Sequence, residues 1–306
     1  MSPPSGSLCG PTGEPISTGK LQGLHAVSTP GGAFAVLALD HLSALSATLD
    51  PDQPATVPDS RLAEIKVRLG QWLAEQSSGV LIDPVVGLQP FLDHGVLAAS
   101  TGLLIGLEDG DYASLDHAPR LFQGWDVARA KEAGADAIKC SFLYDPSLPS
   151  DVAHDFVAAL VVDCARADLP LFAEPLAPPS LHADRRRTVV ETARSIAALG
   201  VDVLKLEFPA DTDGTDAEWL DACSELSEAI RQPWTLLSAG ANFSTFVRQF
   251  TIACQTGASG YVAGRAVWKD VVADGLEEHS PQLAEARSRL RLLTDIAEAN
   301  ARPWMD

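Results

Sequence analysis

The feature that most constrains the fold of this chain is a regular alternation of short apolar runs with longer segments of helical periodicity. The apolar runs have the length and aliphatic composition of buried parallel strands. Eight strands are predicted, at Phe34–Leu39, Gly79–Ile82, Gly102–Leu107, Ala137–Phe142, Leu169–Ala173, Val203–Leu206, Trp234–Leu237 and Gly260–Ala263. Helices are predicted at Arg61–Ala74, Val152–Ala167, Arg187–Leu199, Phe243–Thr256 and Pro281–Asn300. Eight strand–helix units in about 250 residues predict an α/β fold of the (β/α)8 or TIM barrel type.

Several helix ends are marked by residues with known capping preferences. A short helix before the first strand is expected to be capped by Ser17 and to end at the turn Pro30-Gly31-Gly32. Ser150 is a candidate N-cap for the helix that follows it. Gly200 and Gly257 each follow a predicted helix directly and are candidate helix ends.

The main alternative fold is an open, doubly wound sheet. A dinucleotide-binding sheet of that kind carries GxGxxG after its first strand, and no such motif follows Phe34–Leu39. No stretch rich in Pro, Gly or Ser divides the later part of the chain. We therefore expect residues 1–30 to form an N-terminal tail and short helix, and residues 31–306 to form a single barrel domain.

The composition excludes several classes of protein. The chain has 306 residues, with 41 Asp and Glu against 22 Lys and Arg, so its formal net charge is −19. A surface this acidic disfavours general binding to nucleic acids or anionic membranes, because phosphate groups would be repelled. With 46% hydrophobic residues the chain can bury a large core, which excludes disorder as its main state.

Other common signals are absent from the sequence. There is no basic segment followed by an apolar stretch at the start and no run of about 18 apolar residues, so we expect a cytoplasmic protein without a signal peptide or membrane span. The five cysteines form no CxxC pair and the seven histidines no HxxxH or HxH spacing, so we expect no metal site. Neither GxSxG nor GxxxxGK[ST] occurs.

Polar residues stand at the carboxyl ends of nearly all predicted strands, where barrel enzymes place their active sites. In chain order they are Asp40, Asp83, Glu108, Lys139, Glu174, Lys205 with Glu207, Ser238 with Gly240, and Gly264 with Arg265. For any single carboxylate of this set, a loop beginning after a strand is an equally good explanation.

Two of the six lysines are harder to explain as loop residues. Lys139 and Lys205 lie inside apolar strands, where lysine is rare and almost never buried without a partner. Strand alternation places Lys205 on the inner face of a barrel and Leu204 and Leu206 on the outer face. A desolvated lysine beside a second cation has a lowered pKa and can attack a carbonyl to form a Schiff base. The alternative is a structural ion pair, such as Lys205 with Glu174.

The seventh and eighth predicted strands indicate an anion site. Each ends in glycine with a donor nearby, in Ser238-Ala239-Gly240 and in Gly264-Arg265. Phosphate sites of such barrels are commonly built from the loops after these two strands, and Arg265 offers a guanidinium fork to phosphate or sulfonate oxygens. The alternative is that the glycines only make tight turns. His41, which follows Asp40, could line the mouth or lie exposed in a loop.

These motifs resemble those of the class I aldolases that include tagatose 1,6-bisphosphate aldolase and sulfofructosephosphate aldolase. The similar segments are Leu37-Ala38-Leu39-Asp40, Phe172-Ala173-Glu174-Pro175, Asp202-Val203-Leu204-Lys205-Leu206-Glu207-Phe208-Pro209, Leu237-Ser238-Ala239-Gly240, and Thr256 to Trp268. The resemblance spans about Ala33 to Val272, and its last segment is the most specific. It is nearer to the sulfofructosephosphate branch.

The resemblance implies a TIM barrel that uses no metal or cofactor, and a homo-oligomer. It implies that Lys205 is the Schiff-base lysine, that Glu174 transfers protons, and that Asp40 and Lys139 are polar partners around the substrate. It further implies that the phosphate is held by Ser238, Gly240, Gly264 and Arg265. One departure stands out, because the family reads Asp-Gln-Arg after the first strand and this chain reads Asp40-His41-Leu42.

The activity implied by this resemblance is reversible cleavage of a ketose phosphate, such as sulfofructose 1-phosphate or tagatose 1,6-bisphosphate. The products would be dihydroxyacetone phosphate and a three-carbon aldehyde. Two alternatives stay open: a deoxyribose-phosphate-type or other sugar-phosphate aldolase, and a non-catalytic barrel that binds sugar phosphates. Lys139, Lys205 and Arg265 are expected to make the mouth locally cationic despite the net charge.

Overall fold

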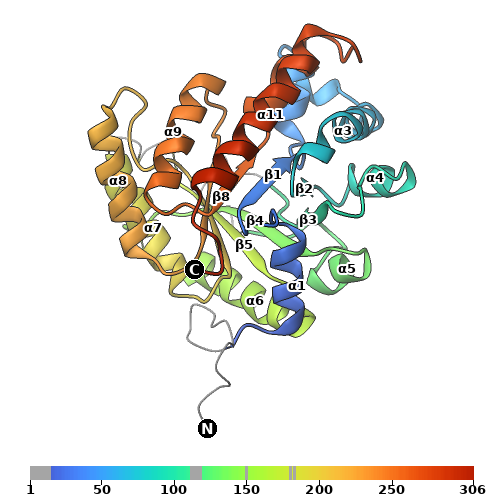
Figure 1. Cartoon of the computed structure of the whole chain (residues 1–306). Helices are drawn as coiled ribbons and strands as arrows, with labels where there is room; N and C mark the ends of the chain where they lie inside the picture. Colours follow the sequence, from blue (N-terminus) through green and yellow to red (C-terminus); the bar gives the residue numbers. More distant parts are fainter. Residues whose placement is uncertain (1–14, 111–118, 149–150, 179–180, 182–183) are drawn as a thin grey trace.

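Eight parallel strands form a closed barrel in the order of the chain, with the last strand paired to the first (Figure 1). This computed structural model describes residues 15–110, 119–148, 151–178, 181 and 184–306. The strands are β1 (Phe34–Ala38), β2 (Gly79–Ile82), β3 (Gly102–Gly106), β4 (Ala137–Leu143), β5 (Leu171–Leu176), β6 (Val203–Leu206), β7 (Trp234–Leu237) and β8 (Gly260–Ala263). Each overlaps a strand predicted from the sequence, so the predicted (β/α)8 barrel is confirmed.

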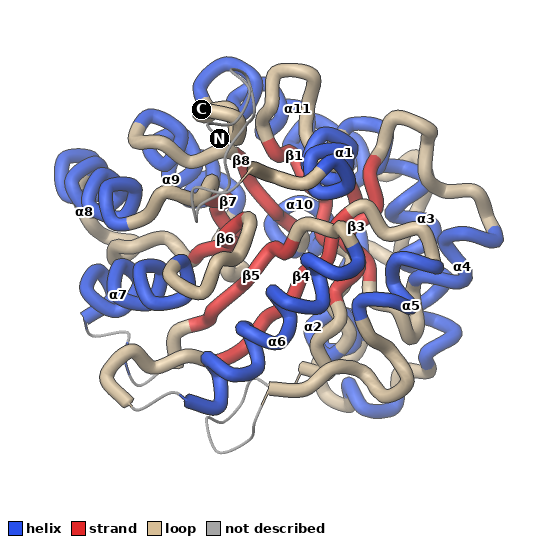
Figure 2. The backbone as a smooth tube through the Cα atoms, turned by 90° about the horizontal axis from the view of Figure 1, so that it is seen from below, coloured by secondary structure: helices blue, strands red, loops and turns tan. Residues whose placement is uncertain are grey.

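Helices surround the barrel and cover the outer faces of its strands (Figure 2). They are α1 (Thr18–Ala26), α2 (Ser43–Leu49), α3 (Asp59–Leu73), α4 (Leu88–Asp93), α5 (Val127–Glu132), α6 (Asp151–Ala167), α7 (Arg185–Ala197), α8 (Asp216–Ala229), α9 (Phe243–Gln255), α10 (Arg265–Ala273) and α11 (Pro281–Asn300), with the 3-10 turns η1 (Pro54–Thr56) and η2 (Ala74–Gln76). The five predicted helices correspond to α3, α6, α7, α9 and α11, with ends that differ by at most two residues.

The strands alternate between residues that face the barrel axis and residues that face the helices. In β6, Val203 belongs to the apolar cluster inside the barrel, whereas Leu204 and Leu206 pack among the helices, as predicted. Phe34 and Phe172 are in edge-to-face contact inside the barrel, with ring centroids 5.2 Å apart. The same alternation in β6 buries the charged side chain of Lys205 above this apolar layer.

The fifth strand differs from the prediction. It was expected at Leu169–Ala173, but β5 runs from Leu171 to Leu176 and so contains Glu174 within it. Leu169 instead closes the end of α6, where Asp168 has a φ of 54° and the Leu169 N–H donates to the Cys164 carbonyl at 3.0 Å. The strand tolerates Pro175 because its pairing with β6 ends at Ala173, so no bond to that neighbour is lost.

The helix α1 packs against the amino-terminal end of the barrel. Leu24 is buried against the apolar cluster inside it. The helix ends at Ala26 rather than at the glycine turn, because the chain then bridges back through Ser28 to β1. Ser17 is at the N-cap but makes no capping bond; its hydroxyl donates to Asp168, which accepts the N–H of Gly19 at 2.9 Å. The division into residues 1–30 and 31–306 stays a prediction.

The predicted helix end at Gly257 is confirmed, because this residue directly follows Thr256, the C-cap of α9, whereas α7 already ends at Ala197, three residues before Gly200. Gly200 and Gly257 have φ values of 86° and 115°, in the left-handed region that favours glycine. The proposed cap Ser150 lies outside the described residues. None of the helices in the described ranges is both long enough and apolar enough to cross a bilayer.

Candidate active site

A cavity of about 460 Å³ opens at the carboxyl ends of the strands. The residues with predicted site roles that line it are Asp40, His41, Lys139, Glu174, Lys205, Ser238, Gly264 and Arg265, and the strand-end carboxylates Asp83, Glu108 and Glu207 line it as well. Gly240 is not part of the wall, but an added Cβ there would lie 3.3 Å from Nη1 of Arg265. The fold thus brings residues with predicted site roles, from six different strands, to one place.

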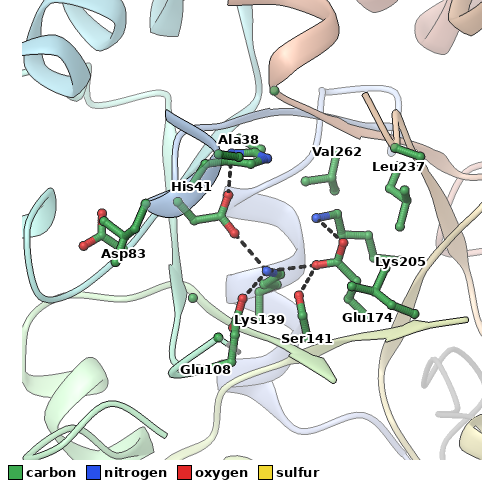
Figure 3. A pocket seen from close by; sticks show the side chains of 18 of the residues that line it. Ala38, His41, Asp83, Glu108, Lys139, Ser141, Glu174, Lys205, Leu237 and Val262 are labelled. Carbon is green, nitrogen blue, oxygen red and sulfur yellow. Dashed lines mark hydrogen bonds and ion pairs between the residues drawn. The ribbon is translucent and has the colours of Figure 1, made fainter. Parts of the chain in front are cut away.

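Lys139, in the middle of β4, lies at the centre of three carboxylates (Figure 3). Its Nζ is 2.8 Å from Asp40 Oδ2 and 2.8 Å from Glu174 Oε2, and it also donates to Glu108 Oε1. Its side chain is only 4% exposed. An ammonium group has three N–H donors, and here three carboxylates surround it. The cluster therefore compensates a charge that would be very costly to bury alone.

Lys205 enters the same cluster from β6. Its Nζ lies 2.8 Å from Glu174 Oε1, while the other oxygen of that carboxylate faces Lys139 and accepts a hydrogen bond from Ser141 (Figure 3). Glu174 is thus a bridge between two ammonium groups, and both of its oxygens are oriented. The Lys205–Glu174 ion pair considered from the sequence is present, and it borders an open cavity rather than a packed core.

The charges in the cluster set the protonation of its carboxyl groups. Burial acts to raise the pKa of Glu174, but Lys139 and Lys205 outweigh it and lower the pKa to about 2. The pKa of Asp40 is likewise held far below its usual range, because Lys139 opposes the effect of burial. For Glu108 burial prevails and the pKa is raised. At neutral pH Glu174 is therefore a carboxylate and able to accept a proton.

His41 lies at the wall between the first and eighth strands. Its Nδ1 is 3.3 Å from Asp40 Oδ1, and its ring is in edge-to-face contact with Trp268 at 5.5 Å. Burial, opposed by Asp40 and reinforced by Arg265, lowers the pKa of His41 to about 4. The imidazole is thus neutral at pH 7. Of the two interpretations of this residue, the structure supports the one in which it lines the mouth.

The ends of β7 and β8 approach each other through glycine positions. Ala239 and Gly240 both have positive φ values, 46° and 76°, in a turn closed by the Ala241 N–H donating to the Ser238 carbonyl at 2.8 Å. At Gly264, a Cβ would lie 2.6 Å from the Ala38 carbonyl oxygen, so only glycine fits. Arg265 begins α10, and its buried Nε has no hydrogen-bond partner in the described part of the chain.

The sequence interpretation missed one contributor to the site, Ser141, and the partner of another, Glu207. Ser141 had no distinguishing signal beyond its place two residues after Lys139, on the same face of β4. Glu207 stood among the strand-end residues, but its partner was not foreseen: Arg185 lies 3.0 Å from Glu207 Oε1 and donates from Nε to the Phe208 carbonyl at 2.7 Å. That pairing joins two distant stretches of sequence, which no local pattern reveals.

A third buried lysine was also missed. Lys66 on α3 is 1% exposed and pairs with Asp83, at the end of β2. The other oxygen of Asp83 accepts the N–H groups of Val86 at 2.7 Å and Gly87 at 3.2 Å. Lys66 lies on the apolar face of an ordinary amphipathic helix, so no local pattern singles it out.

No group of three or more His, Cys, Asp or Glu side chains is placed to hold a metal ion within the ranges that the structure describes.

Comparison with known proteins places the chain in a family. Residues 34–270 match the model of the DeoC/LacD family aldolases. The chain is 28% identical to tagatose 1,6-diphosphate aldolase 2 of Enterococcus faecalis, over 94% of this chain and 96% of that protein. It is 29% identical to tagatose 1,6-diphosphate aldolase 1 of Streptococcus pyogenes serotype M3, over 95% and 99%.

Solved structures share the fold. An archaeal fructose 1,6-bisphosphate aldolase superposes with a TM-score of 0.64 at 20% identity, over 89% of this chain and 98% of that chain. A Schiff-base-forming fructose-1,6-bisphosphate aldolase gives 0.62 at 19% identity, with the same coverage. Since the family model covers most of the barrel, the chain belongs to the DeoC/LacD family of aldolases and is, as predicted, a carbon–carbon lyase.

Proposed function

We propose that this aldolase cleaves a ketose 1-phosphate through a Schiff base on Lys205, giving dihydroxyacetone phosphate and an aldehyde. The observation that carries the proposal is the 2.8 Å contact between Lys205 Nζ and Glu174 Oε1 at the wall of the cavity. It joins a nucleophilic amine to a base that is ionised at neutral pH. The relatives named for tagatose 1,6-diphosphate support a phosphorylated ketose as substrate.

The geometry supports a sequence of steps in which Glu174 carries the proton. Glu174 first accepts a proton from Lys205, whose amine then adds to the C2 ketone. Glu174 returns that proton to the carbinolamine oxygen, which leaves as water, and an iminium remains. Glu174 next removes the proton of the C4 hydroxyl; the C3–C4 bond breaks, its electron pair converts the iminium to an enamine, and C4 leaves as the carbonyl carbon of the aldehyde. Protonation of C3 and addition of water then release dihydroxyacetone phosphate and restore the amine.

The remaining residues hold these groups in place. Lys139 and Ser141 fix the Glu174 carboxylate through the oxygen that does not face Lys205. Asp40 shares Lys139 with Glu174 and keeps it in position. Arg265, with the backbone around Gly240 and Gly264, is proposed to anchor the 1-phosphate, which would orient the ketone carbon toward Lys205.

Borohydride trapping tests the proposal. The protein is incubated with dihydroxyacetone phosphate, reduced with borohydride, digested and examined by mass spectrometry. We expect one adduct per chain on the peptide containing Lys205, and none in Lys205→Met. Lys131→Met, at an exposed lysine, is the matched control and should be labelled like the wild type. An adduct on another lysine, or none at all, would refute the proposal.

The same experiment separates the two alternatives. A deoxyribose-phosphate-type aldolase would be trapped by a short aldehyde such as acetaldehyde and not by dihydroxyacetone phosphate. A non-catalytic binding barrel would bind the sugar phosphate without any trapped adduct. The homo-oligomer implied by the resemblance and the cytoplasmic location expected from the sequence stay predictions.

A further inference from the structure

We infer that the substrate carries a single anionic group, the 1-phosphate, and that its far end is uncharged. This inference rests on the proposed function, because it concerns the substrate of the same site. It selects ketose 1-monophosphates over ketose 1,6-bisphosphates and over ketose 1-phosphates that end in a sulfonate.

Few cationic side chains line the cavity. The stretches that the structure leaves undescribed contain no Lys or Arg, so all 22 such residues of the chain lie in described positions. Three of them line the cavity: Lys139, Lys205 and Arg265. These three are therefore the lysine and arginine side chains of the described wall that could form an ion pair with an anionic group of the substrate.

Two of the three are already engaged. Lys139 is surrounded by Asp40, Glu108 and Glu174, and it is only 4% exposed. Lys205 is paired with Glu174 and becomes the covalent attachment point in the proposed reaction, so it cannot also hold a terminal phosphate. Because breaking a buried, hydrogen-bonded ion pair is costly, a second phosphate would gain little by competing for either ammonium group.

Arg265 is the lining cation that remains. It forms no ion pair with any described residue, and its Nε is buried and unpartnered there. Its guanidinium lies against the turn at Gly240, where backbone comes close without a side chain in the way. One guanidinium fork matches one phosphate, since its donors are coplanar and bind two oxygens of the same anion.

The rest of the described wall offers no further Lys or Arg. Its other side chains are acidic (among them Asp83, Glu108, Asp109 and Glu207), apolar (among them Leu42, Phe122, Leu143 and Leu176), or neutral and polar (His41, Ser43, Ser141 and Ser238). The two arginines nearest to these acids are occupied: Arg120 Nε donates to Asp109 at 2.8 Å, and Arg185 Nη2 to Glu207 at 3.0 Å. A phosphate at the far end would meet carboxylates and hydrocarbon. A hydroxymethyl group would not be repelled.

The test compares substrates that differ only at C6. Fructose 1-phosphate is compared with fructose 1,6-bisphosphate, and tagatose 1-phosphate with tagatose 1,6-bisphosphate, so that the result does not depend on the configuration at C4. The concentration of each ketose that gives half-maximal borohydride adduct is measured, and kcat/KM for cleavage is followed through dihydroxyacetone phosphate, the common product. Sulfofructose 1-phosphate is a third arm, compared with fructose 1-phosphate.

We expect kcat/KM for the monophosphate of the accepted pair to exceed that for its bisphosphate by at least about tenfold. The monophosphate should also give half-maximal adduct at a lower concentration. A difference of this size is expected when the second phosphate lacks one charged hydrogen-bond partner. The sulfonate should be disfavoured in the same way. Equal or better use of a bisphosphate or the sulfonate, with Lys205 still trapped, would overturn this inference alone. No adduct with any ketose or with dihydroxyacetone phosphate would overturn the proposed function as well.

Discussion

Two buried lysines of this barrel, Lys66 and Lys205, have similar partners but different surroundings. Both side chains are almost fully buried, and both face a carboxylate. Lys66 and Asp83 form a closed pair, because the other oxygen of Asp83 is taken by backbone N–H groups. Lys205 shares Glu174 with a second ammonium group and borders a cavity of about 460 Å³.

The difference is the structural reason why Lys205, and not Lys66, is the proposed reactive lysine. Around Lys66, every polar atom of the pair has a protein partner, so the pair fixes the end of β2 against α3. Around Lys205, the bridging carboxylate can pass a proton to either side, and the cavity gives a carbonyl access to the amine. What distinguishes the proposed reactive site is the second cation and the open space.

The largest effect is expected from Lys205→Met. The amine is lost while Glu174 keeps Lys139 and Ser141, so kcat should fall by about 10³-fold or more and the free energy of unfolding should change by less than about 1 kcal/mol. Steady-state cleavage assays and urea denaturation measure the two quantities. Substantial residual turnover would show that another group is the nucleophile.

Lys66→Met should show the opposite pattern. It leaves Asp83 charged and buried, so the free energy of unfolding should fall by about 3–5 kcal/mol while borohydride trapping on Lys205 persists. Adding Asp83→Asn removes the stranded charge and keeps an acceptor for the Val86 N–H, so the double variant should regain part of the loss. Urea denaturation of both variants measures this, and a double variant no more stable than Lys66→Met would contradict the pairing argument.

The third effect is a pH dependence of stability that comes from His41. Its pKa is lowered from 6.5 to about 4 in the folded protein, so between these values the unfolded chain binds a proton that the folded chain does not. Stability should therefore fall as the pH drops from 6.5 toward 4, by at most about 3 kcal/mol from this residue. His41→Gln should show a shallower dependence in thermal melts across this range. The control His94→Gln, at an exposed position, should match the wild type.

The smallest effect is expected from Ser141→Ala. It removes one hydrogen bond to Glu174, worth about 1.5 kcal/mol for a charged acceptor, so kcat should fall by about tenfold with little change in KM. Ser141→Thr, which keeps the hydroxyl, should retain more activity than Ser141→Ala. Unchanged kcat in Ser141→Ala would mean that Lys139 alone orients Glu174.

Much of the fold was predictable because barrel strands are apolar on both faces and leave a strong local signal. The strands at Val203–Leu206 and Trp234–Leu237 were placed at their observed bounds for this reason. The fifth strand was misplaced for two reasons. Its start depends on the left-handed turn at Asp168, and its end depends on pairing with β4, which continues through Pro175 to Leu176. Both are relations between segments that a window of sequence does not contain.

The charge of the mouth was also decided by tertiary structure. Lys139, Lys205 and Arg265 were expected to make it cationic, and all three line the cavity. The fold brings Asp40, Glu108 and Glu174 onto the two lysines, so Arg265 is left as the one lining cation without an ion pair among the described residues. That balance could not be read from a net charge of −19.

The sequence by itself determined the barrel, the family and the inward position of Lys205, because each follows from local periodicity or from a contiguous motif. Tertiary structure alone decided which carboxylates meet which cations. Lys139, Glu174 and Lys205 come from three strands, and Lys66 reaches Asp83 from a helix on the outside. Ion pairs depend on distances between side chains that closure of the barrel fixes, and spacing along the chain does not encode those distances.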